Sequence, residues 1–311
     1  MKNSLLLIFI SIIFYNCGSD DLHEKTHITE DSIGYKIPSP IIMGQKNEGC
    51  IANIIFLAEG FTYSEMDEFI DLCDIAKQTI LEIEPFASAS DNLNFYRVES
   101  SSKTSGIREQ QFTSICNDTN GINTTSNTPW AVFSNRVGLK RYAGMEVEKR
   151  NLLEQQYGNY ATGDYAYTII IANTYEYLGS GETPGTTEHN TILKPKISNM
   201  IVSKYDSDLI FKYLIRHEFG HSFGNMDDEY ESPETLCAMK TYEPWFLPQE
   251  PKPNVLTYNP NNWYEGARYS STGYWREWEN SIMRDDYYST TFSPIQVNIL
   301  EQRLKEAVGC P

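Results

Sequence analysis

The feature that most constrains this chain is an HExxH pattern, formed by His217-Glu218-Phe219-Gly220-His221. In a helix, residues four positions apart share a face, so the two imidazoles would lie side by side within reach of one metal ion. Glu218 would lie about 100° further round the helix axis, close enough to meet a water molecule beside that ion. The pattern is typical of zinc hydrolases, and it predicts one zinc ion bound by His217 and His221.

The residues before and after the motif predict a helix. Four side chains recur at every fourth position along it: Leu209, Tyr213, His217 and His221. Ser207 or Asp208 can cap its first turn, because both side chains accept hydrogen bonds from free backbone N–H groups. Gly224 marks the expected end of the helix, since glycine readily adopts the left-handed conformation that follows many helices.

A catalytic zinc ion needs a third protein ligand and one position open to water. No histidine follows His221, so a third ligand further along the chain must be of another type. The candidates are the acidic residues shortly after Gly224, namely Asp227, Asp228 and Glu229. The residues alone leave all three open. Those that do not bind the metal would lie in a solvated turn or orient a histidine.

The rest of the chain predicts alternating strands and helices. Apolar, β-branched and aromatic runs predict strands at 51–57, 94–98, 165–172 and 197–202. Helical spacing predicts helices at 64–83 and 145–156. A loop or lid is predicted at 100–128, a turn at 177–181, and an edge position in the sheet for 197–202. This order predicts one α/β (α+β) layered domain over residues 46–311.

The chain opens with the pattern of a targeting signal. Lys2 precedes an apolar run over residues 5–14, which is too short to span a bilayer and suits the core of a secretory signal peptide. Cys17 follows this run, and the acidic stretch 19–21 comes next. This arrangement resembles a bacterial lipoprotein signal, and the acidic stretch is similar to the surface-export tags of Bacteroidetes lipoproteins.

That resemblance implies a lipoprotein signal peptide at residues 1–16 and a mature chain that begins at a lipid-modified Cys17. Residues 17–45 are polar and predict a flexible tether. The protein is therefore expected to be exported and to lie at the outer membrane or cell surface, with the lipid anchor as its only membrane contact. An ordinary signal peptide with an incidental Cys17 is the alternative.

The chain is acidic, with 25 Lys and Arg residues against 42 Asp and Glu residues and a formal net charge of -17. Phosphate backbones would repel such a chain, which argues against a nucleic-acid partner. Five further cysteines occur after Cys17, and none forms a CxxC pair: Cys50, Cys73, Cys116, Cys237 and Cys310. In an oxidising compartment they allow up to two disulfides and leave one thiol over, in a pairing that the sequence does not give.

The stretch HEFGHSFGNMDDEY at 217–230 resembles the zinc-binding segment of the bacterial IgA-peptidase family, the sixty-fourth family of metallopeptidases. Other stretches resemble further parts of that family: 54–62, 84–86, 94–96, 105–106, 177–181, 265–266 and 273–276. The resemblance implies a metzincin-like zincin catalytic domain with a mixed twisted sheet, an active-site helix that carries HExxH, and a Met-turn at Met283 beneath the zinc ion.

The resemblance also ranks the third ligand. The family's Asp-Glu-Tyr aligns with 228–230 and selects Asp228, whereas strict metzincin spacing selects Asp227 as the second choice, with Glu229 third. It implies that Glu218 is the general base and that zinc-activated water hydrolyses peptide bonds. Two tyrosines could stabilise an oxyanion over the site: Tyr287 or Tyr288.

The implied function is that of a secreted, surface-tethered zinc endopeptidase acting on extracellular proteins, with host immunoglobulin among the candidate substrates. If strand 197–202 lies beside the site at the sheet edge, it would pair with extended substrate. Two alternatives remain open at this point. One is a catalytically inactive binding lipoprotein on the same scaffold. The other is a zinc hydrolase acting on glycan or cell-wall amides, for which three neighbouring tryptophans would suit sugar stacking: Trp263, Trp275 and Trp278.

Overall fold

The computed structural model describes residue 35 and residues 37–116, 124–182, 196–243, 250–284 and 287–308. The sequence predictions for residues 1–16, Cys17 and Cys310 lie outside these ranges. No helix within the described ranges is both long enough and apolar enough to cross a membrane.

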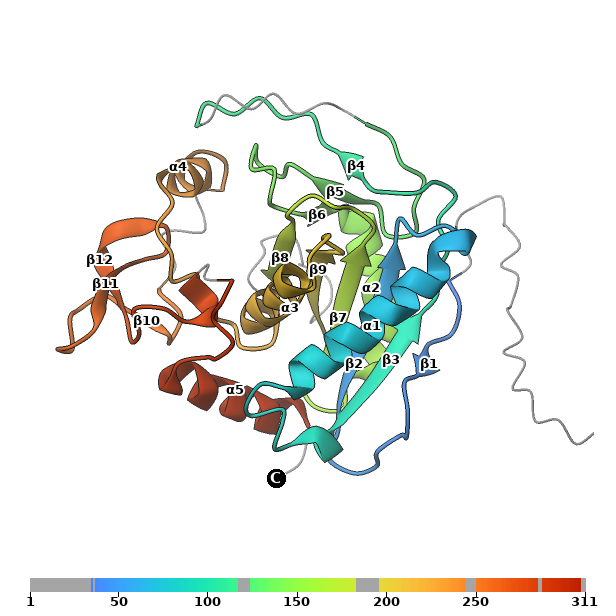
Figure 1. The fold of residues 1–311 in the computed structure, drawn as a ribbon, viewed down its shortest axis with the longest axis horizontal. Coiled ribbons are helices and arrows are strands. Elements are labelled where there is room, and N and C mark those ends of the chain that lie inside the picture. The colour runs from blue at the N-terminus through green and yellow to red at the C-terminus, as the bar shows by residue number, and fades with distance from the viewer. Residues whose placement is uncertain are drawn as a thin grey trace, which may run out of the picture.

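A six-stranded mixed sheet lies at the centre of the described structure (Figure 1). In spatial order its strands are β1 (Ile41–Ile42), β3 (Leu93–Val98), β2 (Ala52–Glu59), β7 (Ala166–Ala172), β9 (Ile197–Ser203) and β8 (Gly179–Glu182). The four inner strands run parallel, whereas β1 and β8 run antiparallel to their neighbours. The inner strands are the four that the sequence predicts. The sheet begins earlier than expected, because Ile41–Ile42 lies in the range predicted as a tether.

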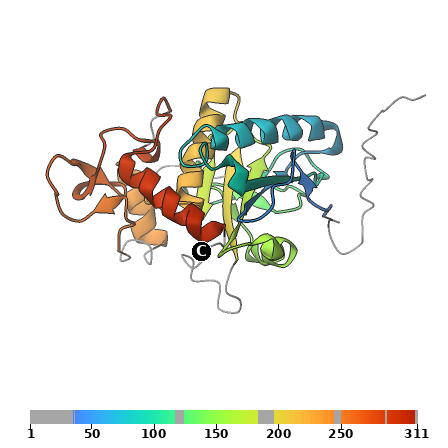
Figure 2. The ribbon, with the colours of Figure 1, turned by 90° about the horizontal axis from the view of Figure 1, so that it is seen from below.

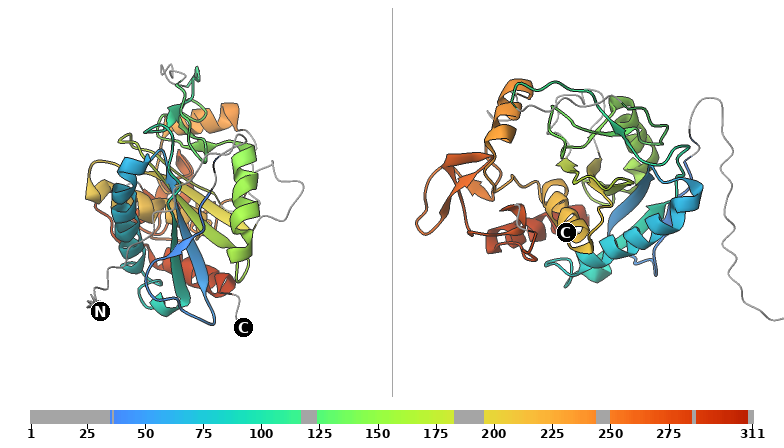
Figure 3. Two further views of the ribbon diagram at one scale, coloured as in Figure 1. Left: turned by 90° about the vertical axis from the view of Figure 1, so that its right-hand side faces the viewer. Right: turned by 45° about the horizontal axis from the view of Figure 1, so that its top comes forward.

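Helices cover both faces of this sheet, as the left view of Figure 3 shows for α1 and α2. One face carries α1 (Met66–Leu81), α3 (Asp208–Ser222) and α5 (Pro294–Ala307), and the other carries α2 (Val147–Tyr157). Side chains alternate along a strand, so Ile54 and Phe56 join the core under α1 and α3, whereas Ile55 and Leu57 join the core under α2. The helices predicted at 64–83 and 145–156 are confirmed as α1 and α2.

The prediction that strand 197–202 lies at the edge of the sheet is wrong. β9 is an inner strand, paired with β7 on one side and with β8 on the other. β8 occupies the edge, in the segment where the sequence predicts a turn. The segment Gly-Ser-Gly-Glu lacks the β-branched and aromatic residues that favour strands, so its composition indicates a turn. Its partner β9 and the helix α3 behind it hold it extended nonetheless.

The chain beyond α3 builds a smaller region beside the sheet, at the left of Figure 1 and in the view from below in Figure 2. It contains α4 (Pro233–Tyr242) and a three-stranded sheet of β10 (Val255–Leu256), β12 (Ser270–Arg276) and β11 (Tyr264–Ala267). α5 then returns to the main core, which Leu300 and Leu304 join. Near α2, a second small sheet is formed by β4 (Arg108–Glu109), β5 (Val132–Ser134) and β6 (Gly144–Met145).

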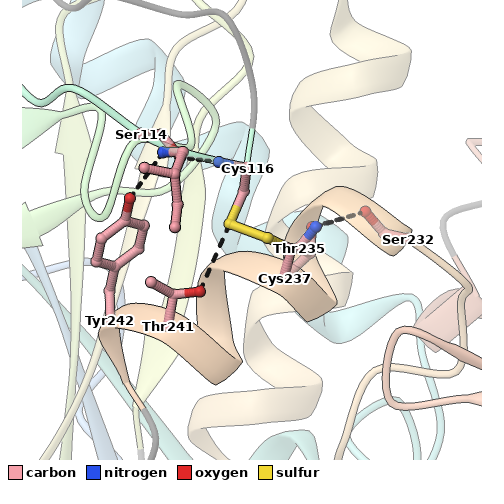
Figure 4. The surroundings of a disulfide bond; sticks show 8 residues. Ser114, Cys116, Ser232, Thr235, Cys237, Thr241 and Tyr242 are labelled. Atoms are coloured by element: carbon pink, nitrogen blue, oxygen red, sulfur yellow. Dashed lines mark hydrogen bonds between the residues drawn. A yellow bond between two sulfur atoms is a disulfide. The ribbon is translucent and has the colours of Figure 1, made fainter.

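A disulfide between Cys116 and Cys237 joins the segment after β4 to helix α4, 121 residues further along the chain (Figure 4). Beside it, Tyr242 Oη accepts a hydrogen bond of 2.8 Å from the backbone N–H of Ile115. Cys50 is also disulfide-bonded, whereas Cys73 is a buried free thiol. The prediction of up to two disulfides and one remaining thiol among the later cysteines agrees with the cysteines that the structure describes.

Candidate metal centre

Helix α3 carries the HExxH motif with both imidazoles on one side. Ser207 occupies the N-cap position, one of the two predicted, but its side chain makes no capping hydrogen bond. The helix ends at Ser222, close to the predicted end, but the left-handed residue that follows is Asn225, with φ of 53°. Gly224 has a different reason to be glycine. A Cβ at this position would overlap the backbone oxygen of Gly220 and the side chain of Met226.

Three side chains converge at the end of this helix. His217 Nε2 lies 3.0 Å from Asp228 Oδ1, and His221 Nε2 lies 3.1 Å from the same oxygen. One potential ligand atom from each of the three residues lies within 4.8 Å of the other two. Among the described His, Cys, Asp and Glu residues, this trio has positions that could hold a metal ion. His217 and Asp228 are each only 6% exposed.

The opposite ring nitrogens of both histidines are held by backbone carbonyls. His217 Nδ1 lies 2.8 Å from the oxygen of Ile282, and His221 Nδ1 lies 2.8 Å from the oxygen of Met226. A carbonyl oxygen can only accept, so each Nδ1 carries a proton and donates it to its carbonyl, which leaves Nε2 of each ring as the atom that can bind a metal ion once its own proton is lost. Two neutral imidazoles and one carboxylate oxygen are a donor set that suits zinc. The residues present therefore fit a metal ion.

The electrostatics of the trio also favour a cation. Burial lowers the pKa values of the two histidines, but the Asp228 carboxylate outweighs this effect, and the pKa of His221 is raised to about 10. Burial raises the pKa of Asp228, but the two histidines outweigh it and hold that pKa well below its usual range. Positive charge is thus stabilised between these three side chains.

Asp227, the second choice for the third ligand, faces away from the histidines. Its carboxylate oxygen Oδ2 lies 3.1 Å from Arg268 Nε and accepts a hydrogen bond of 2.8 Å from the backbone N–H of Lys252. Its backbone N–H and C=O both bond the side-chain amide of Asn254, at 2.9 Å each. These contacts hold Asp227 against the region of β10 to β12.

Glu229, the third choice, is buried and faces away as well. Its carboxylate accepts hydrogen bonds from three side chains: Asn254 at 3.0 Å, Ser281 at 2.7 Å and Gln296 at 2.7 Å. Burial raises the pKa of Glu229 to about 7. The contacts of Glu229 link the acidic segment to α5 and to the turn before it, so its role in the structure is to brace the segment.

Met283 lies beneath the motif, in a short 3-10 helix at Ile282–Arg284. A Cβ at Gly220 would overlap the Met283 sulfur, so the turn packs directly against the helix between the two histidines. The backbone oxygen of Ile282 holds His217, and the backbone oxygen of Met283 accepts a hydrogen bond of 2.8 Å from Glu229 N–H. This turn therefore supports both the helix and the acidic segment.

Glu218 lies beside the trio and under the edge strand β8. It is 6% exposed, and burial raises its pKa, although the two neighbouring histidines oppose this effect. Gly179 at the start of β8 leaves the space that the Glu218 carboxylate fills. Gly181 lies against the backbone of Glu218 and the Cβ atom of His221 in the same way. The two glycines let the edge strand lie directly on the helix.

Two tyrosines near the trio have no signal in the sequence that relates them to it. Tyr269, in the turn between β11 and β12, donates a hydrogen bond of 2.5 Å to Asp228 Oδ2. Tyr142, between β5 and β6, donates a hydrogen bond of 3.0 Å to Tyr269 Oη. Tyr269 is 41 residues from Asp228 in the sequence, and Tyr142 is 127 residues from Tyr269, so no local spacing could have predicted these contacts.

The remaining predicted residues are two tyrosines and three tryptophans. The Tyr287 ring packs against Tyr213 at 5.2 Å between centroids, while Tyr288 is 80% exposed, and a role in stabilising an oxyanion stays a prediction for both. Trp275 lies on β12, whereas Trp263 and Trp278 flank the small sheet. Among the described residues, no ring contact joins these three tryptophans into a platform for a sugar.

A family model described as IgA Peptidase M64 matches residues 47–263, well over half of the 311 residues. The match includes the two histidines, Glu218 and Asp228, whereas Tyr269 and Met283 lie beyond its end. No curated protein matches the chain.

Proposed function

The chain belongs to the IgA peptidase M64 family, a family of peptidases, and from this premise we propose that it is a zinc metalloendopeptidase that hydrolyses extracellular polypeptides. The observation that carries the proposal is the convergence of two imidazole Nε2 atoms on one oxygen of Asp228, next to the buried Glu218. We further propose that the domain is metzincin-like and that Met283 forms its Met-turn.

The proposed ligands of the zinc ion are His217, His221 and Asp228. Their Nε2 atoms and the oxygen Oδ1 face one another, while the other candidate ligands, Asp227 and Glu229, are committed to other partners. When bound, zinc supplies Lewis-acid polarisation of a carbonyl group and lowers the pKa of water from about 15.7 to about 7. Three protein ligands leave a position open, as catalytic zinc sites require.

Glu218 is the proposed general base. Its raised pKa favours a side chain that can take up a proton from the attacking water and later release it to the leaving amine. The contact with Gly179 restricts where the carboxylate can lie, because the backbone of β8 closes one side of it. The burial of Glu218 keeps bulk water away from the reacting groups.

The proposed substrate-binding edge is β8, which replaces the strand at 197–202 in this role. On β8, the N–H of Gly179 faces away from β9 and donates to the backbone oxygen of Arg141 at 3.0 Å. Backbone groups alternate along a strand, so those of Gly181 face the same outward side and can pair with an extended polypeptide. Glu182 ends the strand in ion pairs with Arg136 and Arg150, at 2.8 and 2.6 Å.

We also propose that the protein is exported and tethered to the outer membrane or cell surface through a lipid on Cys17. The support is the short apolar run ahead of Cys17 and the acidic residues behind it. Immunoglobulin is one candidate substrate class, suggested by the name of the family alone. Labelling of the expressed chain with a fatty-acid analogue tests the anchor, and a Cys17→Ser variant should lose both the label and the membrane association.

The proposed function is tested by two measurements. A diffraction map at the zinc absorption edge should show a peak between His217, His221 and Asp228. In a second experiment, fluorescently labelled casein and immunoglobulin A are incubated with the zinc-loaded protein and with Glu218→Ala. We expect the unmodified protein to cleave the substrates and Glu218→Ala to lose cleavage with zinc still bound. Glu301→Ala, a surface control on α5, should cleave them fully. A fully active Glu218→Ala variant would contradict the mechanism.

A further inference from the structure

The two oxygens of Asp228 have different partners. Oδ1 lies 3.0 and 3.1 Å from the Nε2 atoms of His217 and His221, whereas Oδ2 accepts a hydrogen bond of 2.5 Å from the hydroxyl of Tyr269. A carboxylate can turn about its last bond, so with no partner on Oδ2 either oxygen or both could face the histidines. The hydroxyl of Tyr269 favours one orientation of the carboxylate group.

Tyr269 lies in a turn that holds it in a strained conformation. Ala267 pairs with Ser270 across the β11–β12 hairpin, and the two residues between them, Arg268 and Tyr269, have φ values of 49° and 66°. Turns of this kind normally carry Asn or Gly, because left-handed backbone is costly for larger side chains. Strain of this type is costly and persists only where the surroundings enforce it.

The surroundings of this turn are the acidic segment itself. The backbone N–H of Arg268 donates to Asp228 O at 2.9 Å, and that of Tyr269 donates to Tyr230 O at 2.9 Å. The Arg268 side chain pairs with Asp227 on one side of the segment, while the Tyr269 side chain reaches Asp228 on the other. Both aspartates therefore have their partners on one turn, which holds them in place.

A second tyrosine fixes the direction of the hydrogen bond. Tyr142 donates its hydroxyl proton to Tyr269 Oη at 3.0 Å, which leaves the proton of Tyr269 for Asp228. Tyr269 is 5% exposed and Tyr142 is partly buried, and a phenol has an ordinary pKa of about 10. They therefore remain protonated donors.

We propose that Tyr269 is a positioning residue for the metal ligand Asp228, and that Tyr142 supports it from behind. The inference rests on the proposed function, since it assumes that Asp228 binds the ion. It concerns a hairpin at 264–276, which begins after the family match ends at residue 263. The hydroxyl of Tyr269 holds Oδ2 out of the centre, so that Asp228 offers one oxygen and a position stays open for water.

The test compares zinc affinity in single-hydroxyl deletions. Zinc is titrated into the metal-free protein in competition with a chromophoric chelator, for Tyr269→Phe, Tyr142→Phe and the control Tyr264→Phe. Tyr264 is on β11 of the same hairpin, where it is 42% exposed. We expect the zinc Kd to rise about 10–100-fold in Tyr269→Phe, by a smaller factor in Tyr142→Phe, and to stay unchanged in Tyr264→Phe.

A spectroscopic measurement separates positioning from a loss of structure. With Co²⁺ in place of zinc, Tyr269→Phe should change the visible absorption, because Oδ2 becomes free to join Oδ1 as a ligand and alters the coordination geometry. Thermal unfolding of the metal-free variants identifies any that fail to fold. If Tyr269→Phe fails to fold, the zinc Kd and the Co²⁺ spectrum of Tyr142→Phe, which leaves the strained turn intact, are compared with those of the unmodified protein instead.

Two outcomes overturn different statements. A folded Tyr269→Phe variant with the zinc Kd and the Co²⁺ spectrum of the unmodified protein overturns the positioning role while the metal centre stands. An unmodified protein that binds neither metal at the trio overturns the proposed function, and the inference fails with it.

Discussion

Gly179 on the edge strand and Glu218 on the helix α3 touch so closely that a Cβ atom on Gly179 would overlap the Glu218 carboxylate. The strand and the helix are thus matched to each other at the position of the proposed general base. The side chain that we propose as the general base has its space defined by a residue 39 positions earlier in the chain.

The variant Gly179→Ala should therefore move Glu218 and lower kcat by about 100-fold, since a displacement of about 1 Å at a reacting group costs that much. Zinc affinity should change little, because the overlap involves none of the three proposed ligands. Cleavage kinetics and zinc titration of the same preparation check both parts. Gly158→Ala is the matched control, because its new Cβ would make only ordinary contacts of 3.6 and 4.0 Å. Unaltered kcat in Gly179→Ala would contradict the proposed role of Glu218.

Substitution of the two adjacent aspartates, Asp227 and Asp228, should have clearly different effects on zinc affinity. Asp228→Ala removes a proposed ligand. Loss of a residue that only orients a ligand lowers metal affinity by about 10–100-fold, so the zinc affinity of Asp228→Ala should fall by more than that. Asp227→Asn keeps an oxygen that can accept from Lys252 N–H and should bind zinc nearly as tightly as the unmodified protein. Competition titration with a chelator measures both. The reverse order of the two affinities would assign the third ligand to Asp227 instead.

Removal of the Cys116–Cys237 disulfide should destabilise the fold. The bond closes a loop of 121 residues, and a native disulfide of this kind contributes about 2–5 kcal/mol, largely by restricting the unfolded chain. The double variant Cys116→Ser, Cys237→Ser should show that loss in urea unfolding. Thr241→Ala, next to the sulfur of Cys116, is a control expected to cost less than about 1 kcal/mol. Equal stability of the double variant and the unmodified protein would show that the bond contributes nothing.

Glu59 should make the stability of the fold depend on pH. Its carboxylate, at the end of β2, accepts hydrogen bonds from Thr128 Oγ1, Trp130 N–H and Val132 N–H, but burial dominates and raises its pKa from 4.5 to about 7. The folded state holds this proton more tightly than the unfolded chain does. Its contribution is therefore fully present below about pH 4.5 and is lost as the pH rises to about 7, a change of about 3 kcal/mol.

The measurement is the free energy of unfolding at several pH values for the unmodified protein and for Glu59→Gln. The difference between the two curves isolates Glu59, because all other titrating groups are common to both. The unmodified protein should lose stability relative to the variant between about pH 4.5 and 7. Parallel curves across that range would mean that Glu59 ionises in the folded state as it does in water.

The sequence predicts the parts of this structure that depend on local patterns. The run 165–172 and the helical spacing before His217 each carry enough apolar periodicity to give β7 and α3. The glycines of β8 carry no such signal, because that strand exists through its contact with α3. The choice between Asp227 and Asp228 could not be made by counting residues either. Asp227 pairs with Arg268 whereas Asp228 meets the histidines, and the direction in which the chain leaves α3 decides which of the two does so.

The bond between Gly179 N–H and Arg141 O has a consequence for how copies of this protein behave in solution. A free strand edge invites pairing with the edge of another molecule, and this is a common route to aggregation. Here the edge is only four residues long, its first outward donor is already bonded, and its last residue carries a charge held by two arginines. Little backbone of this described strand is therefore left for the edge of a second folded copy to pair with.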